Sequence, residues 1–234
     1  MREVAGLEGA AVRYRLLSLQ RTAAERARLE GFLSEAELRR GARLLDPKKR
    51  DEFLVGRGLV REALAELLSV EPRAVEFREG EFGKPYLRGQ RELPDGLRFN
   101  VSHAGGKLLL AVSRTCEIGV DLEEIREDLA FRPMAERYFS LREKEELFGL
   151  GPAEQLEAFY RCWTRKEAYM KGTGSGFSQP STGFDVSLLP GEPPALLAHR
   201  VDPGEVQRWG IVDLEAGPGC CAALAVEQKL RRGE

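Results

Sequence analysis

The segment 159–171 places an acid and a base on a helix whose other residues form an apolar stripe. At about 100° per residue, Trp163 and Met170 fall on one face, and Glu167 lies about 40° from Trp163 on the same projection. We therefore expect the Glu167 carboxylate to point inward, with Lys171 one turn further along at the edge of the stripe. A half-buried carboxylate requires a cation beside it, so chemistry is expected on this helix.

The four basic residues of this segment divide between the two sides of the helix. Lys166 lies on the other flank of the stripe, so Lys166, Glu167 and Lys171 are positioned to surround a ligand. Arg161 and Arg165 project to the opposite side and are expected to face solvent. The alternative is that Glu167 and Lys171 form an ordinary i,i+4 pair, worth about 0.2–0.5 kcal/mol when exposed. Their inward projection favours the ligand site.

A second acidic pair, Asp121 and Glu123, belongs to an alternating strand expected at 117–123. Because alternate residues of a strand point to one face, the two Cα atoms should be about 6–7 Å apart. Together with Glu167 they would offer three carboxylates, the oxygen ligands with which Mg²⁺ is held beside substrate phosphates. The alternative is that Asp121 and Glu123 are charges that protect a sheet edge.

Arginine and histidine residues supply candidate anion contacts. Asp46-Pro47 predicts the start of a long helix over 48–68, on which Arg57 projects toward the buried face with Arg61 alongside. These arginines either extend along apolar surface or bind phosphate. Ser102-His103 ends a strand expected at 97–103, where the ring can reach a ligand, although a lone histidine is more often structural. Since no partner residue is suitably placed, we do not expect a hydrolase triad.

The composition excludes several classes of protein. The chain has 234 residues, 42% of them apolar, with a formal net charge of −2. It is therefore expected to be globular, without the basic field of a nucleic-acid binder. Its four cysteines lack C-x-x-C spacing and indicate neither a zinc site nor a disulfide framework. Neither a signal sequence nor a membrane span is recognisable, so a cytoplasmic location is expected.

The pattern of elements predicts an α+β fold with two similar subdomains, 1–115 and 116–234. Each half would hold one long helix with inward charges, packed on a small, mainly antiparallel sheet. The strands are expected at 12–19, 97–103, 107–113, 117–123 and 221–226. Further helices should begin at the capping boxes Ser34-x-x-Glu37 and Ser140-x-x-Glu143.

Four motifs, taken in order, resemble the surfactin-type 4'-phosphopantetheinyl transferases. They are Gly83-Lys84-Pro85-Tyr86, Phe99-Asn100-Val101-Ser102-His103, Ile118-Gly119-Val120-Asp121-Leu122-Glu123 and Trp163-Thr164-Arg165-Lys166-Glu167-Ala168-x-x-Lys171. The Trp-x-x-Lys-Glu-Ala form is typical of the larger subgroup. The length is similar to that of the pseudo-dimeric members rather than the shorter trimeric relatives, so the resemblance implies a monomer.

This resemblance implies transfer of the 4'-phosphopantetheine group of coenzyme A to a serine of an apo acyl or peptidyl carrier protein, with release of 3',5'-ADP. Mg²⁺ would be the cofactor and coenzyme A the substrate. By carry-over the metal ligands are Asp121, Glu123 and Glu167, the catalytic residues are Glu167 and Lys171, and the coenzyme A contacts are Arg50, Arg57, Gly83, Lys84, Pro85, Ser102, His103, Lys166 and Lys171. The carrier contacts are expected around Arg137-Tyr138-Phe139-Ser140.

One position departs from the family pattern. Glu52 stands where the surfactin-activating member has an arginine, and the neighbouring Arg57, which projects inward, is our choice for the 3'-phosphate. Two other functions are compatible with some of these candidate residues. A coenzyme A-binding module without catalysis would lack a metal ligand or Lys171, and all of these are present. A Mg²⁺-dependent phosphoesterase would need only the acidic cluster, but no water-activating base other than Glu167 is evident.

Overall fold

A computed structural model describes residues 1–4, 11–90, 92–176 and 179–228. The helices are α1 (Ala23–Glu30), α2 (Glu35–Ala42), α3 (Pro47–Leu68), α4 (Phe131–Tyr138), α5 (Leu141–Gly149), α6 (Pro152–Thr173) and α7 (Glu205–Arg208). The strands are β1 (Arg2–Glu3), β2 (Val12–Ser18), β3 (Phe77–Glu79), β4 (Pro85–Leu87), β5 (Arg98–Ala104), β6 (Lys107–Ser113), β7 (Ile118–Glu124), β8 (Phe184–Val186), β9 (Leu196–His199), β10 (Trp209–Asp213) and β11 (Cys220–Glu227).

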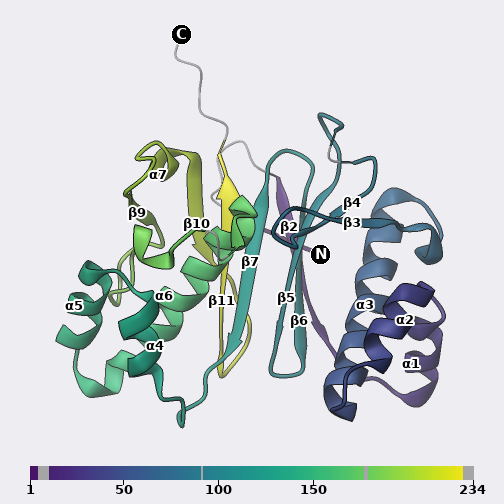
Figure 1. Cartoon of the computed structure of the whole chain (residues 1–234), viewed down its shortest axis with the longest axis horizontal. Helices are drawn as coiled ribbons and strands as arrows, with labels where there is room; N and C mark the ends of the chain where they lie inside the picture. The colour runs from purple at the N-terminus through teal and green to yellow at the C-terminus, as the bar shows by residue number, and fades with distance from the viewer. Residues whose placement is uncertain (5–10, 91, 177–178, 229–234) are drawn as a thin grey trace.

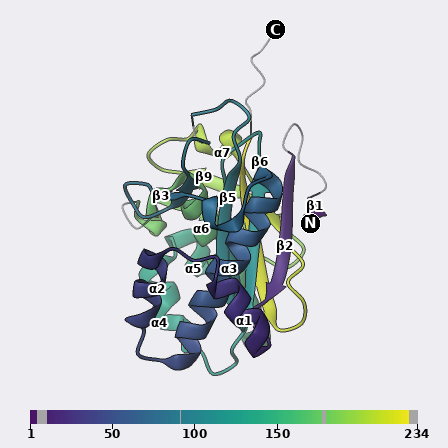
Figure 2. The same cartoon turned by 90° about the vertical axis from the view of Figure 1, so that its right-hand side faces the viewer.

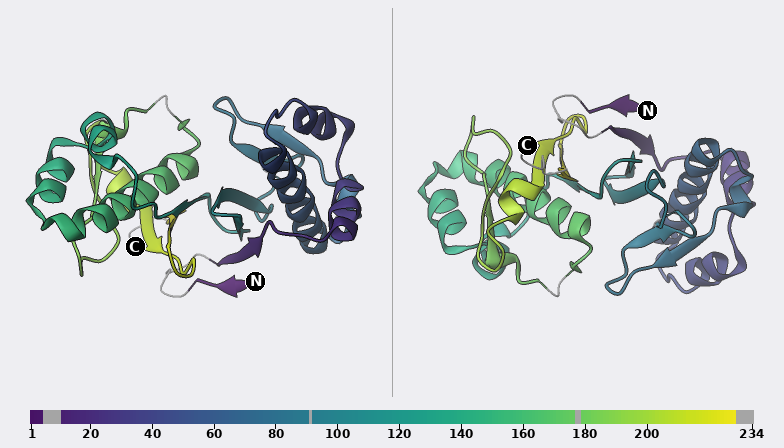
Figure 3. Two further views of the ribbon diagram at one scale, coloured as in Figure 1. Left: turned by 90° about the horizontal axis from the view of Figure 1, so that it is seen from below. Right: turned by 90° about the horizontal axis from the view of Figure 1, so that it is seen from above.

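Helices gather at the two ends of the molecule, and the longest strands stand between them (Figure 1). Helices α1–α3 form one end and α4–α6 the other, as the views from above and below also show (Figure 3). The strands form two antiparallel sheets, in the orders β1-β2-β6-β5 and β10-β11-β7, with two separate hairpins, β3-β4 and β8-β9. The predicted α+β class is confirmed.

Local sequence signals begin the helices where we expected. The Asp46 carboxylate accepts a hydrogen bond from the Lys48 amide at 2.9 Å and caps α3, whose first residue is Pro47. Proline suits this position because its missing N–H would have no intrahelical partner. The predicted capping boxes also form at the starts of α2 and α5, with both reciprocal hydrogen bonds in each.

Helix α3 lies against the first sheet and α1, as seen when the α1–α3 end faces the viewer (Figure 2). At Gly58 a Cβ atom would lie 2.6 Å from the Leu29 Cβ, so glycine is needed where α3 crosses α1. One hydrophobic core lies beneath α3, and a second surrounds α6. A third core, which includes Val12, Leu109 and Leu224, joins the two sheets. The halves thus share an interface, and the division after residue 115 stays a prediction.

Strand β7 differs from its expected alternating pattern. Residues 118–122 are all buried, because α6 covers β7 while β11 and β5 flank it. The Val120 amide donates to Asn100 Oδ1 at 2.9 Å, so an asparagine side chain links β7 to β5 where the two sheets meet. Asp121 is consequently buried rather than exposed at a sheet edge. In the described part of the chain, no helix is long and apolar enough to span a bilayer.

Candidate active site

Asp121, Lys171 and Ser102 come together from three different elements. The Lys171 ammonium donates to Asp121 Oδ1 at 2.6 Å and to Ser102 Oγ at 3.1 Å. Ser102 Oγ in turn donates to the same Asp121 oxygen at 3.0 Å. Strand β7, helix α6 and strand β5 therefore meet at one point, although the three residues lie far apart in sequence. The predicted proximity of the acidic strand and the basic helix position is present.

The other oxygen of the Asp121 carboxylate, Oδ2, lies in a different environment. Asp121 is only 3% exposed, and its Oδ2 atom is buried without a hydrogen-bond partner among the described residues. Burying a charged oxygen without a partner is costly. The observation therefore indicates a place for a cation or a donor from a ligand.

Glu123 lies on the same strand, half-buried, and is held by an indole. Trp163 Nε1 donates to Glu123 Oε1 at 3.2 Å. Burial raises the pKa of Glu123, with a smaller contribution from the Asp121 charge, and the Trp163 hydrogen bond opposes both. The indole is itself fixed by ring contacts with Phe159 and Tyr138 at centroid distances of 5.9 and 5.6 Å.

Glu167 faces these residues from α6, as predicted. Its pKa is raised to about 7, mainly by burial and in part by the charges of Asp121 and Glu123, and the Lys171 charge opposes these effects. Three carboxylates thus interact electrostatically around one point. Among the described residues, no group of three acidic, histidine or cysteine side chains is placed so that it could hold a metal ion. The Lys171 ammonium contacts Asp121 Oδ1, which leaves the unpartnered Oδ2 as the oxygen that an ion would approach.

The close approach of α6 and β7 depends on two glycines. A Cβ atom at Gly119 would overlap the backbone of Gly172 and of Ala168, so the strand and the helix are in direct backbone contact. Only residues without a side chain permit this approach. As a result, the side chains of Asp121 and Lys171, which lie next to this contact, can reach each other.

Lys166 is not a ligand contact, and this part of the prediction is wrong. The Lys166 side chain is 2% exposed. Its ammonium donates to both Glu143 carboxylate oxygens and to the Phe184 carbonyl, each at 2.8 Å. Three acceptors satisfy its three N–H donors. Lys166 therefore joins α6 to the start of α5 and to β8, and its role is structural.

The expectation that Arg165 faces solvent is also wrong. Arg165 is 1% exposed, pairs with both oxygens of Asp213 at 2.9 and 2.6 Å, and donates to the Ser187 carbonyl. The projection assumed that one face of the helix meets solvent. Helix α6 instead lies between the β10-β11-β7 sheet and the layer formed by α4, α5 and β8, so Arg165 and Lys166 are enclosed despite their charge.

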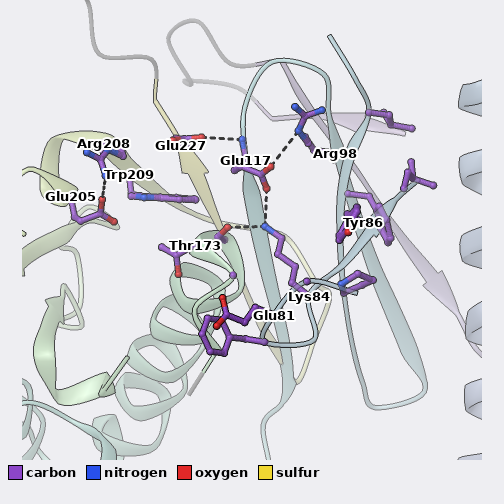
Figure 4. Close-up of a pocket in the computed structure, with 18 residues that line it drawn as sticks. Glu81, Lys84, Tyr86, Arg98, Glu117, Thr173, Glu205, Arg208, Trp209 and Glu227 are labelled. Carbon is purple, nitrogen blue, oxygen red and sulfur yellow. Dashed lines mark hydrogen bonds and ion pairs between the residues drawn. The ribbon is translucent and has the colours of Figure 1, made fainter. Parts of the chain in front are cut away.

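The predicted coenzyme A contacts are spread over a wider region. His103 is exposed at the end of β5 beside buried Ser102. Gly83, with φ of +83°, precedes Lys84 and Pro85 in the β3-β4 turn, where glycine alone tolerates this backbone conformation. This turn lines a cavity of about 470 Å³ between the two halves (Figure 4). The acidic cluster does not line this cavity.

The two arginines chosen for phosphate lie on α3 and have protein partners. Arg57 pairs with Glu37 at 3.0 Å and covers the Phe77 ring at 4.6 Å. Arg50 donates to the Leu44 carbonyl at 2.9 Å. The structure therefore does not gather them with the carboxylates of β7 and α6, and their role toward a phosphate stays a prediction.

Sequence reasoning missed two contacts that shape the site. The Trp163–Glu123 hydrogen bond joins residues 40 positions apart, and the Lys84–Gly172 bond joins residues 88 apart. The sequence placed Trp163 in the apolar stripe and in the Trp-x-x-Lys-Glu-Ala motif, but did not identify it as a donor to Glu123. Its indole N–H must find an acceptor when the ring is buried, and that requirement was the available signal.

Comparison with known proteins agrees with these features. Residues 117–217 match the model of the 4'-phosphopantetheinyl transferase superfamily, and residues 12–115 match that of the 4'-phosphopantetheinyl transferase N-terminal region. The 4'-phosphopantetheinyl transferase HetI of Nostoc sp. is 38% identical over 198 residues, which cover 85% of this chain and 80% of HetI. The Bacillus subtilis strain 168 transferase Sfp is 29% identical over 77% of this chain and 82% of its own length.

Among solved structures, Thermotoga maritima holo-[acyl-carrier-protein] synthase matches 49% of this chain and 64% of its own, with 23% identity and a TM-score of 0.39. The relationship to HetI extends over most of both chains, and the two family matches together run through both halves. The chain belongs to the 4'-phosphopantetheinyl transferase superfamily.

Proposed function

We propose that this protein transfers the 4'-phosphopantetheine group of coenzyme A to a serine of an apo acyl or peptidyl carrier protein and releases 3',5'-ADP. The observation that carries the proposal is the contact of Lys171 with Asp121, beside which Glu123 and Glu167 interact electrostatically with both, in a chain of this family. Coenzyme A brings a diphosphate and a 3'-phosphate to a protein whose net charge is −2. Local cations must therefore hold it.

Asp121, Glu123 and Glu167 are our candidates to hold Mg²⁺. The buried, unpartnered oxygen of Asp121 and the raised pKa values of the two glutamates fit a site that gains from a cation. Carboxylate oxygens are also the ligands that Mg²⁺ prefers. When bound, the ion would neutralise diphosphate charge and lower repulsion toward the incoming serine oxygen.

The chain's own residues supply the remaining steps. The serine oxygen bonds to the phosphorus that carries pantetheine, and the bond from that phosphorus to the bridging oxygen breaks. Glu167 accepts the serine proton, directly or through a water, for which a pKa of about 7 is suitable. The departing 3',5'-ADP takes the electron pair, and the Lys171 ammonium stabilises its charge.

The remaining substrate contacts are proposed by analogy with the motifs. Ser102 and His103 would contact coenzyme A phosphates, the Gly83–Pro85 turn would lie against the adenine, and Arg57 would reach the 3'-phosphate. We assign the protein to the surfactin-type branch, in its Trp-x-x-Lys-Glu-Ala subgroup, because all four motifs occur in order. The monomeric state and the cytoplasmic location stay predictions.

We propose that the carrier protein docks at the end of α4 and the start of α5. Arg137 is exposed there, and the Leu141 side chain is 67% exposed. A small hollow lined by Tyr138, Trp163 and Glu167 opens between this region and the acidic cluster. A positive and apolar surface suits the acidic carrier proteins expected as partners.

The test is to incubate the protein with coenzyme A, Mg²⁺ and several apo carrier proteins, and to measure carrier mass. We expect a mass increase of one phosphopantetheine, lost when the conserved serine of the carrier is replaced by alanine. A binding module would bind coenzyme A and leave every carrier unchanged. A phosphoesterase would release phosphopantetheine or phosphate in the absence of any carrier. Either of these results would replace the proposal.

A further inference from the structure

The side chain of Lys84 ends in a cluster of three acceptors from the other half of the protein. Its ammonium donates to the Gly172 carbonyl at 2.7 Å, to Glu117 Oε2 at 3.0 Å and to the Ile118 carbonyl at 3.1 Å. Figure 4 shows the Lys84 side chain directed toward Glu117. The Lys84 side chain is 18% exposed. Glu117 is held in turn by Arg98 Nε at 3.3 Å. We call this cluster the Lys84 clamp.

Two of these acceptors belong to the elements that carry the candidate catalytic pair. Gly172 directly follows Lys171 in the last turn of α6, and Ile118 is the first residue of β7, which carries Asp121. A helix C-terminus presents carbonyls without intrahelical partners, and an ammonium is favoured there. The clamp therefore ties the end of α6 to the start of β7.

The clamp lies next to the backbone contact between the same two elements. A Cβ atom at Gly119 would lie 2.1 Å from the Gly172 amide nitrogen, and one at Gly172 would lie 2.6 Å from the Trp209 ring. Because glycines have no side chains that could interlock, this contact does little to prevent α6 from sliding along β7. A three-coordinate ammonium at the crossing supplies the missing restraint.

We propose that Lys84 is a positioning residue whose ammonium sets the register of α6 on β7 and thereby the 2.6 Å contact between Lys171 and Asp121. The inference rests on the proposed function of that pair. It assigns the Lys84 ammonium to the protein rather than to coenzyme A, because three protein acceptors match its three N–H donors. A shift of about 1 Å at a reacting group can cost about a hundredfold in rate.

The test compares Lys84→Met with the wild type in steady-state assays. We expect kcat to fall by about tenfold or more, and KM for coenzyme A to change by less than about threefold, because positioning acts on the reaction rather than on binding. Lys107→Met is the matched control. The Lys107 ammonium also crosses between the halves, donating to the Ala216 carbonyl at 3.0 Å and to Cys220 Sγ at 3.2 Å, and neither of these acceptors belongs to α6 or β7. Its loss should leave kcat unchanged.

Two further variants keep the test decisive if Lys84→Met does not fold. Lys84→Arg retains the charge but cannot place one nitrogen on all three acceptors, so kcat should fall again. Glu117→Gln removes the ion pair and leaves both carbonyl bonds, so its effect on kcat should be smaller.

A raised KM for coenzyme A with unchanged kcat in Lys84→Met would mean that the ammonium binds substrate, and would overturn the inference. Unchanged kcat and KM in both Lys84 variants would also overturn it. These outcomes require an active wild type, whereas failure of the proposed function would appear as a wild type that modifies no carrier. The two failures are therefore distinguishable.

Discussion

The Lys171 ammonium lies 2.6 Å from one oxygen of Asp121, while the second oxygen of that carboxylate is buried without a hydrogen-bond partner in the described ranges. The Asp121 carboxylate thus has one oxygen with hydrogen-bond partners and one without. Glu123 and Glu167 add charge nearby, since both of their pKa values are raised in part by Asp121. This imbalance is why we assign a cation to the site, and it makes Asp121 the first residue to change.

Asp121→Asn should reduce transfer to the carrier by at least two orders of magnitude, because it removes a charge between Lys171 and the proposed ion while keeping the side-chain shape. The rate would be measured by carrier mass at saturating coenzyme A. Ser113→Ala, a buried change on β6 away from the site, serves as the control and should retain activity. Activity retained in both Asp121→Asn and Glu167→Gln would refute the metal assignment.

The rate should rise with pH through about 7, because the pKa of Glu167 is raised to about 7 and only its carboxylate can accept a proton or hold a cation. Higher Mg²⁺ should move the midpoint to lower pH, since a cation favours the ionised form. The measurement is kcat against pH at two Mg²⁺ concentrations. A profile that stays flat from pH 6 to 8 would contradict this role.

The raised pKa of Glu167 has the opposite effect on stability, which decreases where the rate rises with pH. Between the ordinary pKa of 4.5 and about 7, the folded protein holds a proton on Glu167 that the unfolded chain has lost. This contribution to folding is therefore present at low pH and decreases as pH rises through about 7. Glu167→Gln should thus gain stability relative to the metal-free wild type as pH rises from 5 to 8, measured by thermal unfolding. A constant difference would argue against the shift.

Trp163→Phe keeps the aromatic packing and removes the N–H that holds Glu123 at 3.2 Å. Removing such an outer partner typically costs about 10–100-fold in metal affinity. The Mg²⁺ concentration for half-maximal activity should rise accordingly. Trp209→Phe, which changes a core indole beside Tyr169, is the control and should leave the Mg²⁺ response unaltered. The same Mg²⁺ requirement in both variants would mean that Trp163 does not support the metal site.

Lys166→Met should destabilise the protein by about 3–5 kcal/mol, because it leaves the fully buried Glu143 carboxylate without its ammonium. The free energy of unfolding in denaturant is the measurement. Lys144→Met breaks the more exposed pair with Glu136 and should cost less than about 1 kcal/mol. A similarly small loss of unfolding free energy in both variants would mean that the buried Lys166–Glu143 ion pair contributes little to stability.

Arg137→Glu should raise KM for the carrier protein without altering KM for coenzyme A, because it reverses an exposed charge on the proposed docking surface. The effect should shrink at high salt, as screening predicts. Arg28→Glu makes the same reversal on α1, at the other end of the molecule (Figure 1). If both variants bind carrier as the wild type does, the docking surface lies elsewhere.

Features encoded by neighbouring residues were predictable from sequence. Asp46-Pro47 begins α3, and the Ser140 capping box begins α5, because caps depend on residues within one turn. The helical projection also gave the correct inward direction of Glu167. It failed for Arg165 and Lys166 because it assumes one solvent face, and nothing local reveals that α6 is enclosed on several sides.

Contacts between distant segments could not be deduced in the same way. The motif containing Lys84 suggested coenzyme A binding, whereas its ammonium contacts Gly172, 88 positions later. Burial of β7 on both faces likewise depends on the placement of α6 and β5. Periodicity describes one element at a time, so partners contributed by other elements require the folded structure.

Titration with Mn²⁺, a spin-active substitute for Mg²⁺, shows whether Asp121, Glu123 and Glu167 hold one divalent ion. Electron paramagnetic resonance would count bound ions in the presence of coenzyme A. We predict one Mn²⁺ per chain in the wild type and a loss of binding in Asp121→Asn, Glu123→Gln and Glu167→Gln. Undiminished Mn²⁺ binding in all three variants would contradict the account.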